Sequence, residues 1–293
     1  GVVIFMDFYI VDVFAEEKYQ GNQLAVLIPS RTISTEEMQK IAREINFNET
    51  TFILSGKQDN GGYDVRIFTP DVEVPFAGHP TLGTAFIIQK VLENNESKQI
   101  TLNLKVGQIP VYIEGEQLIM KQNPPELGTI IPDQDIFTEI LQIPNEDIDS
   151  RFPIQIVSTG LPAVIVPLCS LDAVNRCKIN HNNYQNFIDN VIKANILAFS
   201  PETKLKENDL NVRVFLDDTG FPEDPATGSA NGNLAGYLIA HNFFESKNIA
   251  YRVEQGFKMG RPSILNIEAK KSQDSIQILV GGKVFLIAKG EWY

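Results

Sequence analysis

Cysteine, basic clusters and long hydrophobic runs are all scarce in this sequence. Only two of the 293 residues are cysteines, Cys169 and Cys177, which is too few for the disulfide framework of a small secreted domain. The longest uninterrupted apolar stretch, residues 161–169, contains two prolines and is far shorter than the roughly 20 residues that span a bilayer. The first residues show no basic segment followed by a long apolar core, so no secretion signal is expected. These absences favour a protein of the reducing cytoplasm.

Positive charge is also in deficit. The chain has 25 Lys and Arg against 37 Asp and Glu, a formal net charge of −12. Because the basic residues form no blocks, binding to a phosphate backbone is not expected. With 43% hydrophobic and 21% charged residues, the composition is that of a globular protein, long enough for one large domain or two of about 150 residues.

Short segments with alternating hydrophobic residues dominate the chain. Such segments predict β-strands, and roughly a dozen of them beside few helices favour an α+β fold over a doubly wound parallel sheet. The predicted strands are residues 8–14, 24–28, 51–54, 64–69, 100–104, 111–115, 118–122, 154–159, 163–168, 210–216, 264–269, 276–281 and 284–289.

Three helices are predicted. Ser34 and Glu37 form a capping box for a helix over residues 35–44, whose apolar residues lie on one stripe. Residues 81–93 and 227–241 are apolar nearly all round, which indicates enclosed helices.

The third predicted helix carries glycine at four-residue spacing, at Gly228, Gly232 and Gly236. An interior glycine costs about 1 kcal/mol relative to alanine, so three glycines on one stripe indicate close packing. The best boundary between domains is Asn123-Pro124-Pro125, which divides the chain into lobes of residues 1–124 and 125–293. The sequence leaves open whether the last strand returns to the first lobe.

An internal repeat is the most informative pattern. Val-Arg-Ile-Phe at 65–68 is echoed by Val-Arg-Val-Phe at 212–215, and Pro-x-x-Gly-[Ser/Thr]-Ala occurs at 80–85 and again at 225–230. The two echoes keep their order, at offsets of 147 and 145 residues. We therefore expect two pseudo-symmetric lobes, each a curved sheet around a central helix, with a cleft between them.

His79 and Asp224 each precede the repeated proline. Both are expected at the N-terminal end of a buried helix, whose free backbone N–H groups and positive dipole attract a carboxylate. An imidazole and a carboxylate there would suit proton transfer on a small acid. Helix capping explains the same two residues equally well, and the sequence pattern leaves both interpretations open.

Glu49 lies between the capped helix and an apolar strand. Desolvation at the start of a buried strand raises the pKa of a carboxyl group, which would make Glu49 a general base near neutral pH. The alternative is a solvated loop glutamate, the commoner state of this residue type.

Other motifs with known chemistry are incomplete. The segment Gly78–Thr84 has phosphate-loop glycines but no lysine, and Ser229 is outside any nucleophile elbow. Neither His181 nor His241 has a zinc-ligand set nearby, and Cys169 and Cys177 lie outside the repeated loops, so no two-thiol racemase mechanism is expected. An acidic patch could hold a divalent cation but lacks calcium-loop spacing and is more typical of a turn; it comprises Asp217, Asp218, Glu223 and Asp224.

Five segments together resemble the PhzF-like phenazine-biosynthesis isomerase family. The ordered match runs from about residue 7 to residue 263 and consists of DVFAEEKYQGNQLAV, NETTF, RIFTPDVEVPFAGHPTLGTA, EDPATGSANG and QGFKMGRPS. FAGHP and EDPATGSA are its most specific parts. The resemblance implies the diaminopimelate-epimerase-like fold of two pseudo-symmetric lobes, each a barrel-like, mostly antiparallel sheet around a central helix. It also implies a homodimer.

The resemblance implies roles for individual residues. A glutamate at the position of Glu49 takes a proton from a ring carbon of dihydro-hydroxyanthranilate and returns it elsewhere, without metal or organic cofactor. His79 and Asp224 fall on family positions that hold polar groups of the substrate. Loop positions that contact substrate correspond to Gly78, Gly228 and Ser229. One departure is Asn48, where family members often carry serine, so substrate recognition is expected to differ.

The resulting hypothesis is a cofactor-independent isomerase that moves a proton on a small, cyclic carboxylic acid. Glu49 would be the acid/base, with His79 and Asp224 as catalytic partners and Asn48, Gly78, Gly228 and Ser229 as substrate contacts. Two alternatives come from other classes. One is a small-acid binding or regulatory protein with the same cleft, and the other is a metal-dependent enzyme that uses the acidic patch. No membrane or nucleic-acid partner is expected.

Overall fold

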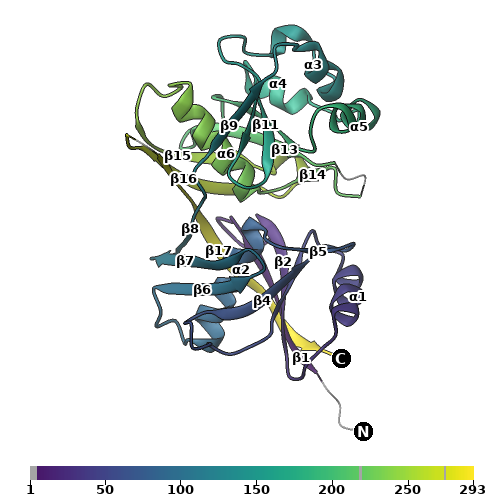
Figure 1. The fold of residues 1–293 in the computed structure, drawn as a ribbon, viewed down its shortest axis with the longest axis vertical. Helices are drawn as coiled ribbons and strands as arrows, with labels where there is room; N and C mark the ends of the chain where they lie inside the picture. Colours follow the sequence, from purple (N-terminus) through teal and green to yellow (C-terminus); the bar gives the residue numbers. More distant parts are fainter. Residues whose placement is uncertain (1–4, 218–219, 274) are drawn as a thin grey trace. The chain divides into compact units, whose positions relative to one another are not determined.

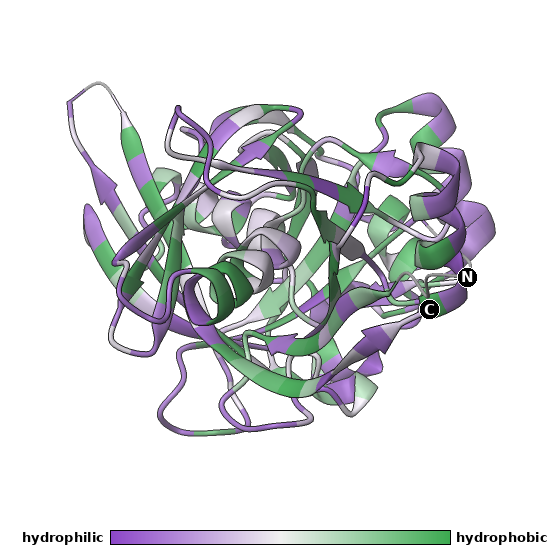
Figure 2. Ribbon diagram, turned by 90° about the horizontal axis from the view of Figure 1, so that it is seen from below, coloured by the Kyte–Doolittle hydropathy of each residue, from purple (hydrophilic) through white to green (hydrophobic). Residues whose placement is uncertain are grey.

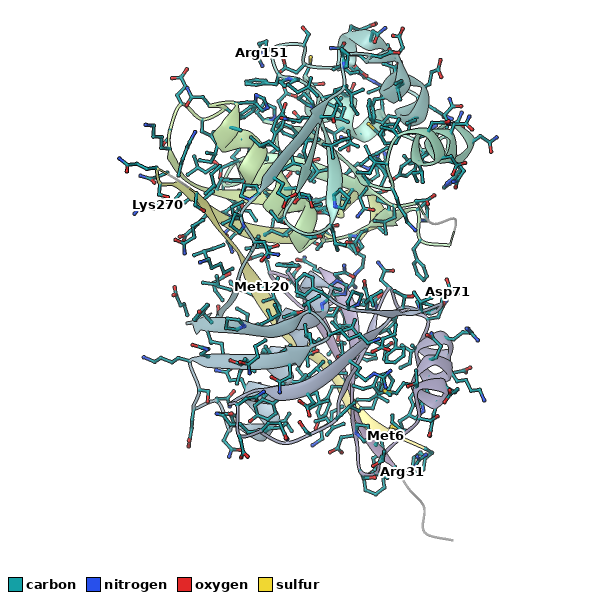
Figure 3. The ribbon with its side chains drawn as sticks, in the orientation of Figure 1. Met6, Arg31, Asp71, Met120, Arg151 and Lys270 are labelled. Atoms are coloured by element: carbon teal, nitrogen blue, oxygen red, sulfur yellow. The ribbon has the colours of Figure 1, made fainter. Side chains whose placement is uncertain are left out.

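The computed structural model describes residues 5–217, 220–273 and 275–293. The chain divides into two compact units (Figure 1). Unit 1 comprises Gly1–Met120 together with Gly281–Tyr293, and unit 2 comprises Lys121–Val280. Met120, labelled in Figure 3, ends the first segment of unit 1, and the chain returns to this unit for its last thirteen residues.

Unit 1 is built on a closed mixed barrel. Its eight barrel strands pair in the order β1–β2–β3–β4–β6–β7–β8–β17, and β17 pairs with β1 to close the ring. The β2–β3 and β4–β6 pairs are parallel, whereas β1–β2, β3–β4, β6–β7, β7–β8 and β17–β1 are antiparallel. The strands are β1 (Met6–Val13), β2 (Asn22–Pro29), β3 (Thr50–Ile53), β4 (Tyr63–Phe68), β5 (Glu73–Val74), β6 (Gln99–Leu104), β7 (Gly107–Glu114), β8 (Gln117–Lys121) and β17 (Ile276–Trp292).

Alternation of side chains explains how these strands enclose a core. In β6, Ile100, Leu102 and Leu104 are buried while Gln99 is exposed, because successive side chains of a strand point to opposite faces. Figure 2 shows hydrophobic and hydrophilic residues alternating along several strands. The buried face of the barrel therefore needs an apolar element to cover it.

Helix α2 (Gly78–Ile87) fills that position and continues as one π-helical turn, Ile88–Leu92. It contacts β1, β2, β3, β6 and β7, and Figure 1 shows it enclosed by the strands of unit 1. A Cβ atom on Gly83 would lie 2.6 Å from Leu24 Cδ2 and 2.9 Å from Val13 Cγ2. Only glycine allows the helix to approach the strands this closely.

Helix α1 (Thr35–Ile45) packs on the outer face of the unit 1 sheet. Its N-terminus is capped by Ser34, whose Oγ accepts from Glu37 N–H, as the capping box predicted. Met38, Ile41 and Ala42 form its buried stripe and join a second apolar cluster with residues of β2, β3 and β4. The amphipathic prediction for this helix is confirmed.

Unit 2 repeats the arrangement with a longer set of elements. Its strands pair in the order β9–β10–β11–β12–β13–β15–β16, and β11–β12 and β13–β15 are parallel, the counterparts of β2–β3 and β4–β6. These strands are β9 (Glu126–Ile130), β10 (Gln155–Ser158), β11 (Pro162–Pro167), β12 (Asn195–Ser200), β13 (Leu210–Phe215), β14 (Glu223–Asp224), β15 (Asn248–Gln255) and β16 (Ser263–Lys271).

Helix α6 (Gly228–Ala240) is the central helix of unit 2 and contacts β9, β10, β11, β12 and β16. A Cβ atom on Gly236 would lie 2.5 Å from Pro125 Cβ, and one on Gly232 would lie 3.0 Å from Gln122 Cγ. The close packing expected from the glycine spacing is confirmed at these two positions.

Three helices of unit 2 are not predicted by the sequence pattern: α3 (Asp135–Leu141), α4 (Leu171–Arg176) and α5 (His181–Asn190). The α5 sequence is rich in asparagine, a weak helix former, but its buried Tyr184 and Phe187 pack into a large apolar cluster with α3 and α4. Strands β9, β12 and β15 and the two-residue strands β5 and β14 are also absent from the prediction. The two predicted segments 276–281 and 284–289 are one continuous strand, β17. Single 3₁₀ turns occur at Asn145–Asp147 and Phe257–Met259.

Candidate active site in two half-sites

Glu49 lies directly before β3, at the end of the connection from α1. Alternate residues of a strand share a face, and Thr51, two residues further on, contacts Thr84 of α2 through its hydroxyl at 2.8 Å. Glu49 is therefore on the side of β3 that faces α2. Its side chain is 19% exposed, so it is half-buried rather than a solvated loop residue. Asn48 precedes it and is also half-buried.

His79 is the second residue of α2 and is 5% exposed. Its Nδ1 atom lies 3.1 Å from the side-chain amide nitrogen of Asn22, and the ring also forms a hydrogen bond with the backbone of Gln23. Burial lowers the pKa of His79 to about 3, an effect that the Gln23 bond opposes. The imidazole is therefore neutral at physiological pH.

Glu49 and His79 meet at the N-terminal end of α2. Glu49 Oε2 and His79 Nε2 are 3.4 Å apart. A neutral imidazole has one N–H and one lone pair. At this distance Nε2 therefore fits both forms of Glu49: it donates to the carboxylate in one tautomer and accepts from the carboxylic acid in the other. We name the set of Asn22, Asn48, Glu49, Gly78 and His79 half-site 1.

Asn22 is a site residue that the sequence pattern does not predict. It follows Gly21, whose φ of +73° excludes most other residues. A Cβ atom on Gly21 would also lie 2.3 Å from Val13 O. The glycine turn between β1 and β2 delivers Asn22 to His79. The available sequence signal is the Gln-Gly-Asn of residues 20–22, which lies within the motif that carries the resemblance.

Asp224 lies in unit 2, at the end of β14, and is 7% exposed. Its Oδ2 accepts a 2.5 Å hydrogen bond from the hydroxyl of Thr227, the N-cap residue of α6. Gly228 and Ser229 are the first two residues of that helix, the former buried and the latter half-buried. These four residues with Asn231 and Gln255 form half-site 2. Asp224 thus precedes its helix by four residues, whereas His79 is within the first turn of its own.

Thr227, Asn231 and Gln255 are not predicted by the sequence pattern either. Gln255 ends β15, and its side chain binds Thr227, Asn231 and the Asp224 carbonyl. The sequence does hold one hint of Gln255: it begins the motif QGFKMGRPS, and the same Gln-Gly pair occurs at residues 20–21, directly before Asn22.

The other candidate groups lie elsewhere or are already bound. Glu223 of the acidic patch pairs with Arg213, and Asp218 lies outside the described residues. Within the described part of the chain, no three His, Cys, Asp or Glu side chains are grouped to hold a metal ion. Cys177 is part of the buried core of unit 2 and Cys169 is exposed. Among described residues no helix has the length and apolarity of a membrane span.

The family model for phenazine biosynthesis-like proteins, PhzC-PhzF, matches residues 11–290. The chain belongs to this family. A relative named trans-2,3-dihydro-3-hydroxyanthranilate isomerase from Pseudomonas fluorescens is 33% identical over 97% of this chain and 98% of its own length. The family and its named members point to an isomerase or epimerase.

Solved structures extend the likeness to the fold. A PhzF-family protein of Bacillus anthracis superposes with a TM-score of 0.91 at 26% identity, covering 99% of this chain and 100% of that one. A probable proline racemase from Agrobacterium radiobacter shares the fold alone, with a TM-score of 0.65 at 10% identity, covering 98% and 93% of the two chains. The fold class implied by the sequence resemblance is confirmed.

Proposed function

We propose that this PhzF-family protein is a cofactor-independent isomerase that moves a proton between two carbon atoms of a small, cyclic carboxylic acid. Glu49 is the acid/base. The contact between Glu49 and the neutral His79, with 3.4 Å between Oε2 and Nε2, is the observation that carries the proposal. The name of the Pseudomonas fluorescens relative supports a hydroxylated, unsaturated ring acid as the substrate class.

In the proposed reaction Glu49 carries the proton and His79 is its neutral partner. The Glu49 carboxylate removes a proton from an sp³ ring carbon, and the C–H electron pair forms a new double bond while the neighbouring double bond shifts by one position. The carboxylic acid then returns the proton to the far end of the shifted system, so atoms and electrons balance. His79 stays neutral because its pKa is about 3. In the tautomer with the ring proton on Nδ1, its Nε2 lone pair can accept from the acid form of Glu49 between the two steps.

Half-site 2 is proposed to bind polar groups of a small-acid substrate. Asp224 can accept from a hydroxyl or ammonium group, and the hydroxyl of Ser229 can donate. The first backbone N–H groups of α2 and α6, at Gly78 and Gly228, have no partners within their own helices and favour a carboxylate. Asn48 supplies an amide beside Glu49.

Deuterium exchange tests the proposal directly. Wild-type protein and Glu49→Gln are incubated in heavy water with trans-2,3-dihydro-3-hydroxyanthranilate and a panel of cyclic and aliphatic acids, and mass spectrometry measures carbon-bound deuterium. We expect uptake with wild type and a loss of about 10²- to 10⁴-fold in Glu49→Gln, the usual contribution of a general base. Glu44→Gln, an exposed change on α1, is the matched control.

Ligands that bind without exchange in wild-type protein would instead identify a non-catalytic small-acid binding protein. Equal exchange in wild type and Glu49→Gln would remove Glu49 from the reaction. Exchange that is lost on treatment with a chelator would favour the metal-dependent alternative.

A homodimer is also part of the proposal, on the ground of the family resemblance. Light scattering of the purified protein measures its mass in solution against the 32.8 kDa of one chain.

A further inference from the structure

Gln255 of unit 2 is a buried polar side chain whose hydrogen-bonding capacity is fully used. It is 1% exposed. Its Nε2 donates to Asp224 O at 2.8 Å and to Thr227 Oγ1 at 3.0 Å. Its Oε1 accepts from Thr227 N–H at 3.2 Å and from Asn231 Nδ2 at 2.8 Å. An amide side chain has two N–H donors and two lone pairs on oxygen, so all four are satisfied.

Two of these partners are backbone groups, and they fix the orientation of the amide. The Thr227 N–H can only donate and the Asp224 carbonyl can only accept. A rotated Gln255 amide would place donor against donor and acceptor against acceptor at both contacts. The Nε2 atom therefore faces the Thr227 hydroxyl.

The orientation of Gln255 decides where the Thr227 proton goes. Because Oγ1 of Thr227 accepts from Gln255 Nε2, its own O–H is directed elsewhere, and its second contact is Asp224 Oδ2 at 2.5 Å. A hydroxyl has one proton to donate. The chain of contacts runs from Gln255 through Thr227 to the carboxylate, and a donated hydrogen bond favours the ionised form of a carboxyl group.

The end of β15 is held rigidly at this place. Gly256, with φ of +77°, allows an approach in which a Cβ atom would lie 2.6 Å from Pro225 O and 2.3 Å from Arg261 O. Glu254 on the other side of Gln255 is fully buried and accepts hydrogen bonds from two backbone N–H groups and two asparagine side chains. The backbone on either side of Gln255 therefore has little freedom to move away from Asp224.

We propose that Gln255 is a positioning residue for Asp224: it sets the direction of the Thr227 hydroxyl, and that hydroxyl holds the Asp224 carboxylate ionised and in place. The inference rests on the role given to Asp224 in the proposed function and adds the residue through which that role is controlled.

Other charged groups lie on the elements packed against Asp224. Glu223 is its neighbour in β14 and pairs with Arg213 of β13. Glu254 of β15 accepts the four hydrogen bonds described above. Further charged side chains of the described residues in these segments are Arg252 of β15, Asp217 before β14, and Lys258 and Arg261 after β15. All of these charged residues stay unchanged in the variants below. A difference in the pKa of Asp224 between variants therefore reports the contact with Thr227.

The test is a titration of Asp224 in the protein without substrate. Aspartate labelled with ¹³C at the carboxyl carbon is followed by NMR against pH, and Asp224→Asn assigns the signal. Thr227→Val should raise the pKa of Asp224 by about one unit, because the carboxylate loses a charge-assisted hydrogen bond. Thr227→Ser, which keeps the hydroxyl, should restore the wild-type value.

Gln255→Met should raise the same pKa by a smaller amount, because the hydroxyl is no longer directed at the carboxylate. Gln255→Leu also removes both the N–H and the C=O groups of the amide without adding a charge. It should raise the pKa by a similar amount, and it decides the question if the methionine variant does not fold. Gln155→Met is the matched control, since Gln155 is a buried glutamine of β10 that bonds Gly128 O and His241, and it should leave Asp224 unchanged.

A purely structural Gln255 would lower stability without moving the titration. An unchanged pKa of Asp224 in the folded Gln255 variants, or in Thr227→Val, would overturn the proposal. The titration needs no substrate, so its result does not depend on the deuterium-exchange experiment. A failure of the isomerase proposal would be seen only in that exchange experiment.

Discussion

The two units use the same ion pair to shape the turn before the central helix. In unit 1, Nε and Nη2 of Arg66 bind the two carboxylate oxygens of Glu73 at 2.8 and 2.7 Å. In unit 2, the same atoms of Arg213 bind Glu223 at 2.8 and 2.8 Å. Bidentate pairs of this kind fix geometry as well as charge. Figure 3 labels Asp71, in the exposed turn that the unit 1 pair closes.

The residues that follow the turn are where the units differ. Unit 1 places a neutral imidazole, His79, in the first turn of α2 beside Glu49. Unit 2 places a carboxylate, Asp224, before α6 and binds it to a threonine hydroxyl. One scaffold thus carries a neutral imidazole in one copy and a hydrogen-bonded carboxylate in the other. The two units share the ion pair and the central helix, and the single residues at or before the start of each helix differ in their chemistry.

Removing the arginine of each pair is expected to have the largest effect and to separate the units. Arg213 is 10% exposed and also donates to Val174 O and Cys177 O, so Arg213→Met leaves a half-buried carboxylate and two carbonyls without this donor. We expect a loss of about 3–5 kcal/mol in the free energy of unfolding. Arg66 is 26% exposed, and Glu73 keeps Lys105 at 2.7 Å, so Arg66→Met should cost about 1–2 kcal/mol.

Urea unfolding followed by circular dichroism measures both variants. Equal losses of unfolding free energy in the two variants would contradict this expectation. They would show that the burial of Arg213 and its contacts with two carbonyls add no stability.

The pH dependence of stability should distinguish the buried His79 of unit 1 from the half-buried His241 of unit 2. The pKa of His79 falls from about 6.5 in the unfolded chain to about 3 in the folded protein, so between these pH values the unfolded state binds the extra proton. Its contribution is fully present above pH 6.5 and is lost as pH falls toward 3, with a slope of about 1.4 kcal/mol per pH unit. His79→Asn should remove this slope between about pH 6 and pH 4.

His241→Asn in unit 2 is the matched control. Burial also lowers the pKa of His241, but its ring is less deeply buried and its Nε2 bonds Gln155, so the variant should change the slope less. Urea unfolding at several pH values gives the slopes. An unchanged slope in His79→Asn would mean that the pKa of His79 does not differ between the folded and unfolded states.

Alanine in place of the helix glycines should give the smallest difference between the units. Gly236→Ala places a Cβ 2.5 Å from the rigid ring of Pro125, whereas Gly83→Ala meets flexible side-chain methyl groups. Overpacking costs about 1–3 kcal/mol, partly offset by the helix propensity of alanine, about 1 kcal/mol. We expect Gly236→Ala to lower the thermal midpoint more than Gly83→Ala. A higher midpoint in either variant would contradict the packing argument.

Much of the fold can be predicted from short sequence patterns. Ser34 and Glu37 locate α1, the glycine spacing locates the tightly packed α6, and the repeat at 65–68 and 212–215 indicates two related units. Strands β9, β12 and β15 escape prediction because neighbouring strands, rather than their own alternation, determine their pairing. Helix α5 escapes it because packing of Tyr184 and Phe187 outweighs the weak propensity of its asparagines.

The candidate site is predictable only in part. His79 and Asp224 are found through the repeated proline, and Glu49 through its place before an apolar strand and the family resemblance. Asn22 and Gln255 are not, because each acts on a residue far away in the sequence, at separations of 57 residues to His79 and 31 to Asp224. A contact between residues so far apart produces no periodic pattern and no fixed spacing in the sequence that could be detected.

The sequence by itself determined where hydrophobic faces, caps and close-packing glycines occur, since these depend on neighbours within one or two turns. It also determined the internal repeat and the family. The tertiary structure decided the protonation state of His79, the approach of Glu49 to its Nε2 and the orientation of the Gln255 amide. These properties depend on burial and on hydrogen bonds between distant segments, and both exist only when the chain is folded.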